Sequence, residues 1–209
     1  MSRYSPLPNP PLKKQAVDFE KHNQLTTRNG SFKRNLEIMK NNPTTSTIYF
    51  RSPIGPLEIT GTKKYLTEIR FAREMGKDAS TRPPAPLKDA YAQLDDYFQG
   101  KRKDFSLPLA PEGTEFQQSV WHELETIPFG QTVAYGDIAR AIGRPKACRA
   151  VGGANNKNPI PIIIPCHRII GANGSLTGYG SGLWRKAWLL KHEKIKVVKD
   201  TVPKEVPDV

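Results

Sequence analysis

The sequence is poor in cysteine and has no long apolar segment. Its 209 residues include only two cysteines, Cys148 and Cys166, which favour a reduced, cytoplasmic protein over a disulfide framework. No run of about 18 apolar residues is present, so we expect no membrane-spanning helix. The first residues lack an apolar segment of signal-peptide length, which argues against secretion. Two cysteines and four scattered histidines provide no metal-ligand cluster, so we expect no metal ion.

Acidic residues are scarce in one part of the chain. The net charge is +12, but residues 132–196 alone carry +9, whereas residues 45–131 carry −1. A segment this basic attracts polyanions, and contacts with phosphates provide affinity for nucleic acid that is independent of sequence. Charge alone is equally compatible with a basic protein that binds no nucleic acid.

The composition predicts four segments. Residues 1–44 are rich in Pro, Asn, Lys and Thr, which is typical of a basic, disordered extension. Within residues 45–110, short apolar runs predict an antiparallel meander of strands at 47–50, 57–60 and 65–71. A helix is expected over 87–99, with a buried face formed by Leu87, Tyr91, Leu94 and Phe98. Residues 111–196 form a second domain and residues 197–209 a tail.

The second domain begins with a pattern of helices. Thr114 is a good N-cap for an amphipathic helix that extends to Ile127. A short helix over 135–142 is closed by Gly143, and Pro145 suits the first turn of a further helix over 146–155. Two short helices joined by a tight, glycine-containing turn predict a helix-turn-helix. We therefore expect an α+β fold overall, with a small sheet domain followed by a mostly helical one.

The second of these short helices has almost no long side chains. It contains Gly152 and Gly153, and each glycine inside a helix costs about 1 kcal/mol relative to alanine. Such a bare surface permits either close approach of a partner's backbone or tight packing against a neighbouring helix. Because basic residues surround it, DNA is the favoured partner; they are Arg144, Lys146, Arg149 and Lys157.

A reactive thiol is predicted after the helix-turn-helix. Residues 162–164 are three isoleucines, typical of a short buried strand that ends at Pro165. Cys166 follows and His167 is adjacent, and because neighbouring cationic groups lower the pKa of a cysteine, we expect an activated sulfur. Adjacent residues of a strand point to opposite faces, so His167 reaches the sulfur only through a turn or a bridging water. Glu193, which follows a helix expected over 183–194, is a candidate to orient His167 or else a solvated surface charge.

These motifs resemble the O6-alkylguanine-DNA alkyltransferase family, the methylated-DNA–protein-cysteine methyltransferases. The resemblance spans residues 114–193 and includes Arg-Ala-Val-Gly at 149–152, Asn-Pro at 158–159, Pro-Cys-His-Arg at 165–168 and Trp-Leu-Leu-Lys-His-Glu at 188–193. It implies a ribonuclease-H-like fold for residues 45–110 and a DNA-binding, alkyl-acceptor domain at 111–196 with a short active-site strand. It further implies a monomer that acts without a cofactor on double-stranded DNA containing O6-alkylguanine.

The resemblance also implies roles for individual residues in catalysis. Cys166 would accept the alkyl group of O6-methylguanine or O4-methylthymine irreversibly, in a single turnover. His167 would take the thiol proton through a water molecule while Glu193 holds the imidazole. Asn158 would brace the turn beside the thiol. Tyr135 would donate a hydrogen bond to the guanine as charge develops.

Contacts with DNA are implied in the same way. Arg149 would enter the duplex where the damaged nucleotide is flipped out, and Tyr135 would rotate the phosphate 3′ to the lesion. Arg168 is expected to link the two domains, through a salt bridge or through packing. Gly180 stands where some relatives have a serine that holds the guanine oxygen, so Ser181 or a backbone N–H is expected to replace it. Further DNA contacts are expected from Arg144, Lys146, Gly152 and Gly153.

Three alternatives belong to other functional classes. A helix-turn-helix regulator would explain the charge and the paired helices, but it needs no Pro-Cys-His-Arg motif. A protein that binds damaged DNA without accepting the alkyl group would be expected to lack the acceptor cysteine, which this chain has at Cys166. In a cysteine hydrolase, the nucleophile usually lies at the N-terminus of a helix and the histidine is distant in sequence, whereas here Cys166 and His167 are adjacent.

Overall fold

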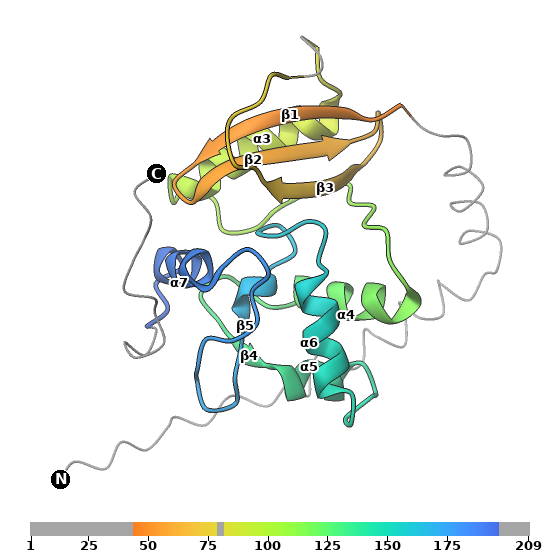
Figure 1. The fold of residues 1–209 in the computed structure, drawn as a ribbon, viewed down its shortest axis with the longest axis vertical. Coiled ribbons are helices and arrows are strands. Elements are labelled where there is room, and N and C mark those ends of the chain that lie inside the picture. The colour runs from red at the N-terminus through yellow and green to blue at the C-terminus, as the bar shows by residue number, and fades with distance from the viewer. Residues whose placement is uncertain (1–43, 79–81, 197–209) are drawn as a thin grey trace. The chain divides into compact units, whose positions relative to one another are not determined.

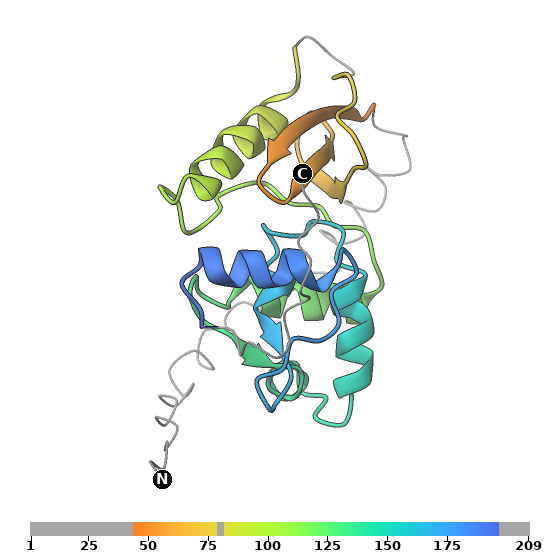
Figure 2. The same cartoon turned by 60° about the vertical axis from the view of Figure 1, so that its left-hand side comes forward.

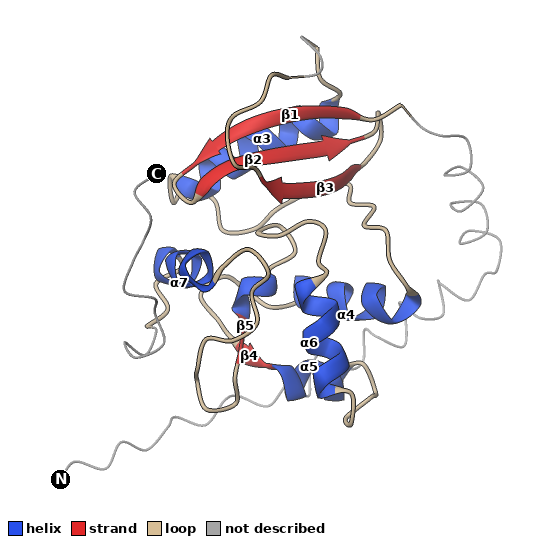
Figure 3. Ribbon diagram, viewed as in Figure 1, coloured by secondary structure: helices blue, strands red, loops and turns tan. Residues whose placement is uncertain are grey.

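The computed structural model describes residues 44–78 and 82–196. The predicted disordered extension, except Thr44, and the predicted tail at 197–209 lie outside the described residues. Within the described part, a three-stranded sheet with one helix precedes a mostly helical region, which confirms the expected fold class (Figures 1 and 3).

The sheet is the antiparallel meander that the sequence predicts. Its strand order is β1-β2-β3, and the strands are β1 (Ser46–Ser52), β2 (Gly55–Gly61) and β3 (Leu66–Phe71). Apolar residues at alternate positions place Ile48, Ile59 and Ile69 side by side on one face, where each is at most 3% exposed. Helix α3 (Ala85–Phe98) packs along this sheet (Figures 1 and 2).

The buried face of α3 differs from the expected one. Leu87, Ala90, Leu94 and Tyr97 are fully buried, whereas Tyr91 is 46% exposed. The expected stripe ran from Leu87 through Tyr91 to Phe98, and the observed stripe uses Ala90 and Tyr97 instead, one residue earlier. A small alanine allows the helix to approach the sheet closely, and Tyr97 then points toward the helical region. This difference places a tyrosine hydroxyl near the candidate site described below.

The helical region contains four α-helices and a small parallel sheet. The helices are α4 (Glu115–Glu125), α5 (Tyr135–Ala141), α6 (Cys148–Asn156) and α7 (Leu183–His192). Strands β4 (Val133–Ala134) and β5 (Ile169–Ile170) pair in parallel, and a 3₁₀ turn, η2, covers Cys166–Arg168. Thr114 caps α4 as expected, because its hydroxyl accepts from Gln117 N while the Gln117 side chain accepts from Thr114 N.

Helices α5 and α6 form the predicted helix-turn-helix against α4. Gly143 has a φ of 70°, which lets the chain turn sharply between the two helices. The expected start of the second helix is wrong: α6 begins at Cys148, three residues after Pro145. Residues 144–147 instead form a turn closed by a 2.9 Å hydrogen bond from Ala147 N to Arg144 O. Arg144 and Lys146 therefore lie before the helix.

The expected strand at 162–164 is absent, and the chain makes a tight turn there. Ile162 has a φ of 77°, and Ile164 N donates to Ile160 O at 2.9 Å. Prolines at 159, 161 and 165 remove three backbone donors from this short stretch, so it cannot form a regular ladder with a neighbouring strand. Cys166 therefore begins η2, and the short strand β5 follows the site instead of preceding it.

The sheet and the helical region share one hydrophobic core. A single cluster of buried side chains extends from Ile48 and Phe50 in β1 to Ile164 and Cys166. A 2.8 Å hydrogen bond from Ile69 N in β3 to Pro159 O ties the sheet to the turn before the cysteine. Trp121 Nε1 donates to Ala154 O at 2.8 Å and fixes α4 to α6. The sheet half thus supports the segment that carries the thiol.

Candidate alkyl-acceptor site

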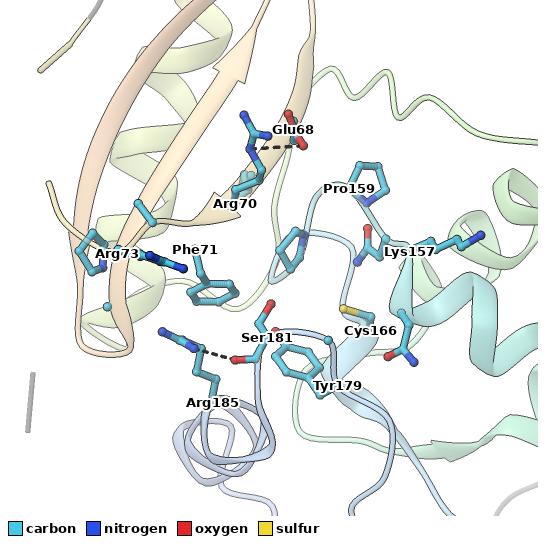
Figure 4. Close-up of a pocket in the computed structure, with 18 of the residues that line it drawn as sticks. Glu68, Arg70, Phe71, Arg73, Lys157, Pro159, Cys166, Tyr179, Ser181 and Arg185 are labelled. Carbon is cyan, nitrogen blue, oxygen red and sulfur yellow. Dashed lines mark hydrogen bonds and ion pairs between the residues drawn. The ribbon is translucent and has the colours of Figure 1, made fainter. Parts of the chain in front are cut away.

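Cys166 lies in the wall of a cavity of about 1270 Å³ (Figure 4). Residues of β3, the end of α6 and the loop before α7 line the cavity, among them Phe71, Asn155 and Tyr179. The cysteine is only 4% exposed. The structure therefore presents the sulfur to a ligand that enters the cavity and shields it from bulk solvent.

Burial keeps the thiol protonated at neutral pH. It raises the pKa of Cys166 to about 11, although a hydrogen bond from Asn158, the charge of Lys186 and nearby backbone N–H groups act in the opposite direction. The expectation that adjacent cationic residues lower this pKa is thus wrong. His167 is buried and neutral, and Arg168 forms an ion pair elsewhere, so neither stabilises a thiolate directly. The sulfur needs a base to become nucleophilic.

His167 has the geometry of such a base. It is fully buried, and its Nε2 lies 2.9 Å from Glu193 Oε1. Burial lowers the pKa of His167 in spite of the attraction from Glu193, so the imidazole is neutral at pH 7. Because the carboxylate can only accept, the ring proton lies on Nε2 and Nδ1 is an acceptor. Among the described residues Nδ1 has no hydrogen-bond partner.

Glu193 is buried and is the centre of a hydrogen-bond network. It is 1% exposed, so the solvated surface charge is the wrong alternative. Arg168 donates to it twice at 2.9 Å, through Nε and Nη2, so the expected salt bridge is present, but both partners lie within residues 111–196 and this pair does not link the two predicted domains. Tyr97 Oη donates to Oε1 at 2.9 Å, and Gly130 N donates to Oε2 at 3.2 Å. Burial by itself would raise the pKa of Glu193, but His167 and Arg168 hold it well below the usual range.

Two asparagines shape the backbone around the thiol. Asn158 Nδ2 donates to Ile164 O at 2.8 Å, and Ile160 N donates to Asn158 Oδ1 at 3.0 Å, so this side chain spans the turn before Cys166. Asn155 Nδ2 donates to Cys166 O at 3.3 Å from the end of α6. The turn and the helix are thereby locked to the segment that carries the sulfur.

Lys186 adds a buried amine close to this cluster. Its side chain is fully buried, and Nζ donates to Thr177 O at 2.7 Å. Burial lowers the pKa of Lys186 to about 8, and the electrostatic attraction of Cys166 opposes that shift. The lysine therefore fixes the loop before α7 and favours negative charge on the sulfur.

Tyr135 lies outside the cavity wall. Its hydroxyl donates to Thr177 O at 3.0 Å, and burial raises its pKa. Tyr135 is the first residue of α5. Its ring faces Gly152 of α6, where an added Cβ atom would lie 3.7 Å from the ring. The tyrosine thus connects the helix-turn-helix to the loop before α7.

The residues expected to contact DNA lie in α5, in α6 and in the turn between them, and of these Tyr135 and Gly152 are half-buried. Arg144, Lys146 and Arg149 are exposed, and the Arg144 guanidinium stacks over Phe116 at 5.5 Å. Beyond its own helix and chain neighbours, a Cβ added to Gly153 would meet no atom of residues 44–78 and 82–196 within 4 Å. Tight packing against a neighbouring helix is therefore excluded as the reason for a glycine at this position.

The loop before α7 closes another side of the cavity. Gly180 and Ser181 both line it, and Ser181 O accepts from Arg185 Nη1 at 2.7 Å (Figure 4). The Arg185 guanidinium stacks over Phe71 at 4.6 Å and over Trp184 at 4.4 Å. Arg185 thus connects the loop to β3 of the sheet.

The described residues show neither a metal centre nor a membrane span. Within 44–78 and 82–196, no three side chains of His, Cys, Asp or Glu are grouped so that they could hold a metal ion. Over the same residues, no helix has the length and apolar character needed to cross a bilayer.

Comparison with known families decides the classification. The family model described as "6-O-methylguanine DNA methyltransferase, ribonuclease-like domain" matches residues 46–111, and the model for the DNA binding domain of the same methyltransferase matches residues 115–195. The chain belongs to this methyltransferase family. The ribonuclease-like match confirms the fold that the resemblance implied for the sheet half.

Methyltransferases from distant organisms resemble the chain over most of their length. A methylated-DNA–protein-cysteine methyltransferase of Methanosarcina acetivorans is 53% identical over 148 residues, which cover 69% of this chain and 95% of the relative. The Mycobacterium tuberculosis protein of the same name is 48% identical over 152 residues, covering 71% and 92%. The crystal structure of the M. tuberculosis O6-methylguanine methyltransferase matches with a TM-score of 0.64 at 44% identity and covers 78% of this chain and 97% of that one. A structure of the mycobacterial protein in complex with DNA gives the same TM-score at 46% identity, with coverages of 76% and 95%.

Three residues of this methyltransferase site were missed by the sequence analysis. Asn155 and Tyr97 carry no motif of their own, although Tyr97 is three residues after Leu94 on the buried stripe of α3. Lys186 did give a signal, because it lies three residues after Leu183 and four before Leu190, where a helix buries apolar side chains. A lysine at such a position indicates a specific buried contact.

Proposed function

We propose that this protein repairs double-stranded DNA by transferring the alkyl group of O6-alkylguanine, or of O4-methylthymine, to Cys166 in one irreversible turnover. The observation that carries the proposal is a buried, protonated thiol next to a neutral imidazole whose Nε2 is bound to Glu193. A protein that only binds DNA has no need of this arrangement. Membership of the methyltransferase family supports the same chemistry.

In the proposed reaction, His167 acts as the base. The proton of the Cys166 thiol passes to His167 Nδ1 through a bridging water molecule. The imidazolium that forms is stabilised by Glu193, whose carboxylate is already ionised because its pKa is held well below the usual range. Lys186, Asn158 and the backbone N–H groups favour the thiolate left behind. No cofactor takes part in these steps.

The transfer itself exchanges one bond for another. A lone pair of the thiolate attacks the methyl carbon, so a sulfur–carbon bond forms as the bond between that carbon and O6 breaks. The electron pair of the broken bond stays on the guanine, which takes up one proton. Tyr135 would donate a hydrogen bond to the guanine as this charge develops, exchanging its bond to Thr177 for one to the base, and the proton taken up is the one that the His167 imidazolium gives back through water. The thioether product is stable, so Cys166 is used once.

Access to the alkyl carbon requires base flipping, because O6 of a paired guanine is buried in the duplex. We propose that the exposed surface of α6 docks in the minor groove, where small residues permit close approach. Arg149 would fill the space left by the flipped nucleotide, and Tyr135 would rotate its 3′ phosphate. Arg144, Lys146, Gly152 and Gly153 would contact the DNA backbone.

We further infer that the protein acts as a monomer in the cytoplasm. We propose that it has two domains, residues 45–110 and 111–196, flanked by an extension at 1–44 and a tail at 197–209. Both cysteines are free, which suits a reducing compartment. Across the described residues the exposed large apolar side chains are few, namely Tyr65, Met75 and Tyr91. A helix-turn-helix regulator is disfavoured because it gives the Cys166, His167 and Glu193 cluster no role.

Intact-mass spectrometry tests the proposal. The protein is mixed with duplex DNA that contains one O6-methylguanine, and in parallel with an O4-methylthymine duplex. We expect a stoichiometric gain of one methyl group, mapped to Cys166 by peptide analysis and absent in Cys166→Ser. Cys148→Ser is the matched control, because Cys148 is exposed, and it should react as the wild type does. Binding of the damaged duplex without any methyl adduct would refute the transfer and leave a damaged-DNA binder.

A further inference from the structure

Tyr97 connects the sheet half of the protein to the base of the candidate site. We propose that Tyr97 is a positioning residue that keeps His167 in its neutral, proton-accepting form by sharing the Glu193 carboxylate with it. The inference depends on the proposed function in assigning His167 the role of base. It gives the ribonuclease-like half, whose sequence contains no cysteine, a direct part in the chemistry.

The contact is short, buried and made by groups of fixed orientation. Tyr97 Oη donates to Glu193 Oε1 at 2.9 Å, and the tyrosine side chain is fully buried. The Tyr97 carbonyl accepts from His192 Nε2 at 2.7 Å, so both ends of the residue are tied to the end of α7. The rings of Phe105, Phe129 and His192 pack around it, with centroids 5.0–6.3 Å away. Tyr97 therefore cannot turn away from the carboxylate without disrupting this junction.

One oxygen of Glu193 serves three donors. Oε1 accepts from Tyr97 Oη, from His167 Nε2 and from Arg168 Nη2, all at 2.9 Å. Oε2 accepts from Arg168 Nε and Gly130 N. Donors to one oxygen compete for the same electron density, so each weakens the attraction that the others experience. Tyr97 is a neutral donor, and it moderates the pull of Glu193 on His167 without adding charge.

The charge state of His167 follows from the groups that face it. Glu193 favours the imidazolium, whereas burial and the positive charges of Arg168 and Lys186 favour the neutral ring. Tyr97 itself faces Glu193, Arg168 and Tyr179, and its pKa lies well above the usual range because of burial and the nearby carboxylate. It therefore stays a donor throughout the working pH range. Without its hydroxyl, Glu193 would attract the His167 proton more strongly, and the imidazolium would form at higher pH.

The rate of methyl transfer as a function of pH tests the inference. Tyr97→Phe removes only the hydroxyl, and we expect its rate deficit to grow from less than about twofold near pH 8 to about tenfold near pH 5.5, since a hydrogen bond to a charged group is equivalent to roughly tenfold in an equilibrium. His192→Phe is a control for the junction, because it removes the donor to the Tyr97 carbonyl and leaves Glu193 untouched. Its deficit should be the same at both pH values. Tyr91→Phe, on the exposed side of α3, should match the wild type.

A second measurement does not depend on catalysis. In Cys166→Ser protein, the imidazole signals of His167 are followed by NMR as the pH is lowered, with and without Tyr97→Phe. We expect protonation of His167 to begin at higher pH in the Tyr97→Phe protein. Unchanged titration, or a rate deficit of Tyr97→Phe that is the same at every pH, would overturn the inference. If wild-type protein transferred no methyl group while the NMR shift occurred, the proposed function would fail and the coupling of Tyr97 to His167 would stand.

Discussion

Replacing Arg168 by methionine should destabilise the protein more than any change of a surface ion pair. The guanidinium is buried with Glu193 as its ion-pair partner, and its Nη1 donates to Ile127 O. Removing one partner of a buried pair costs about 3–5 kcal/mol, because it leaves the other charge uncompensated. Methionine retains the apolar stem of the side chain, so this cost is mainly electrostatic.

The magnitude is set by the donors that Glu193 keeps. After Arg168→Met, the carboxylate still accepts from Tyr97, His167 and Gly130, which places the loss at the lower end of that range. The Ile127 carbonyl loses a donor as well, and a buried unpaired group costs about 1–3 kcal/mol. We expect a total of about 4–6 kcal/mol, which corresponds to a fall in Tm of about 8–24 °C for a chain of this size.

Urea denaturation at neutral pH, followed by tryptophan fluorescence, measures the change. Arg140→Met is the matched control, because Arg140 pairs with Asp137 on α5 while its side chain is 65% exposed. Exposed pairs contribute about 0–1 kcal/mol, so the control should unfold almost as the wild type does. A loss below about 1 kcal/mol for Arg168→Met, or equal losses in the two variants, would refute the conclusion that the buried network holds the site together.

Two further predictions concern acid stability and the DNA-contacting surface. Burial lowers the folded-state pKa of His167, so below about pH 6.5 the unfolded chain binds a proton that the folded protein does not. The free energy of unfolding should therefore fall as the pH drops below about 6.5, by up to about 1.4 kcal/mol per pH unit. It should fall further below about pH 4.3, because Glu193 has a lowered pKa in the folded state and the unfolded chain takes up its proton first. The free energy of unfolding, measured by denaturation at several pH values between 7 and 5, should depend less on pH in His167→Gln. An identical dependence in the two proteins would contradict a lowered pKa for His167. Gly153→Ala should raise the free energy of unfolding by about 1 kcal/mol, since the added Cβ meets no neighbour, yet it should weaken DNA binding at the α6 surface. DNA titration by fluorescence anisotropy that showed unchanged affinity would exclude close approach at this glycine.

Local signals were sufficient to predict much of the fold. The strands β1 to β3 and the N-cap at Thr114 are encoded within a few neighbouring residues, and both predictions are confirmed. The isoleucines at 162–164 predict a strand by their propensity, but the prolines at 159, 161 and 165 remove the donors that a strand requires, and the chain turns instead. The face of α3 was misjudged for a different reason: periodicity fits two neighbouring stripes, and packing against the sheet selects Ala90 over Tyr91.

The candidate site was predictable in its members but not in its protonation. The motifs predicted Cys166, His167 and Asn158, and the structure places the first two in one buried 3₁₀ turn, with the half-buried Asn158 bonded to the turn before it. Whether Glu193 was a partner or a surface charge depended on the burial of the end of α7, which sequence does not reveal. The protonated state of the thiol has the same origin, because desolvation outweighs the neighbouring positive charges. Tyr97 reaches the site from 96 residues away, and no local pattern records such a contact.

The burial of the Cys166 sulfur also bears on how long each molecule stays useful. A protein that is spent after one reaction must not lose its nucleophile to peroxides or to stray electrophiles before it meets a lesion. Oxidants and alkylating agents attack exposed thiolates, whereas this sulfur is 4% exposed and carries its proton up to a pKa of about 11. Burial and the raised pKa keep most of the thiol protonated, and they thereby lengthen the time for which an unreacted molecule keeps its acceptor sulfur. Reaction is then favoured when a flipped nucleobase occupies the cavity.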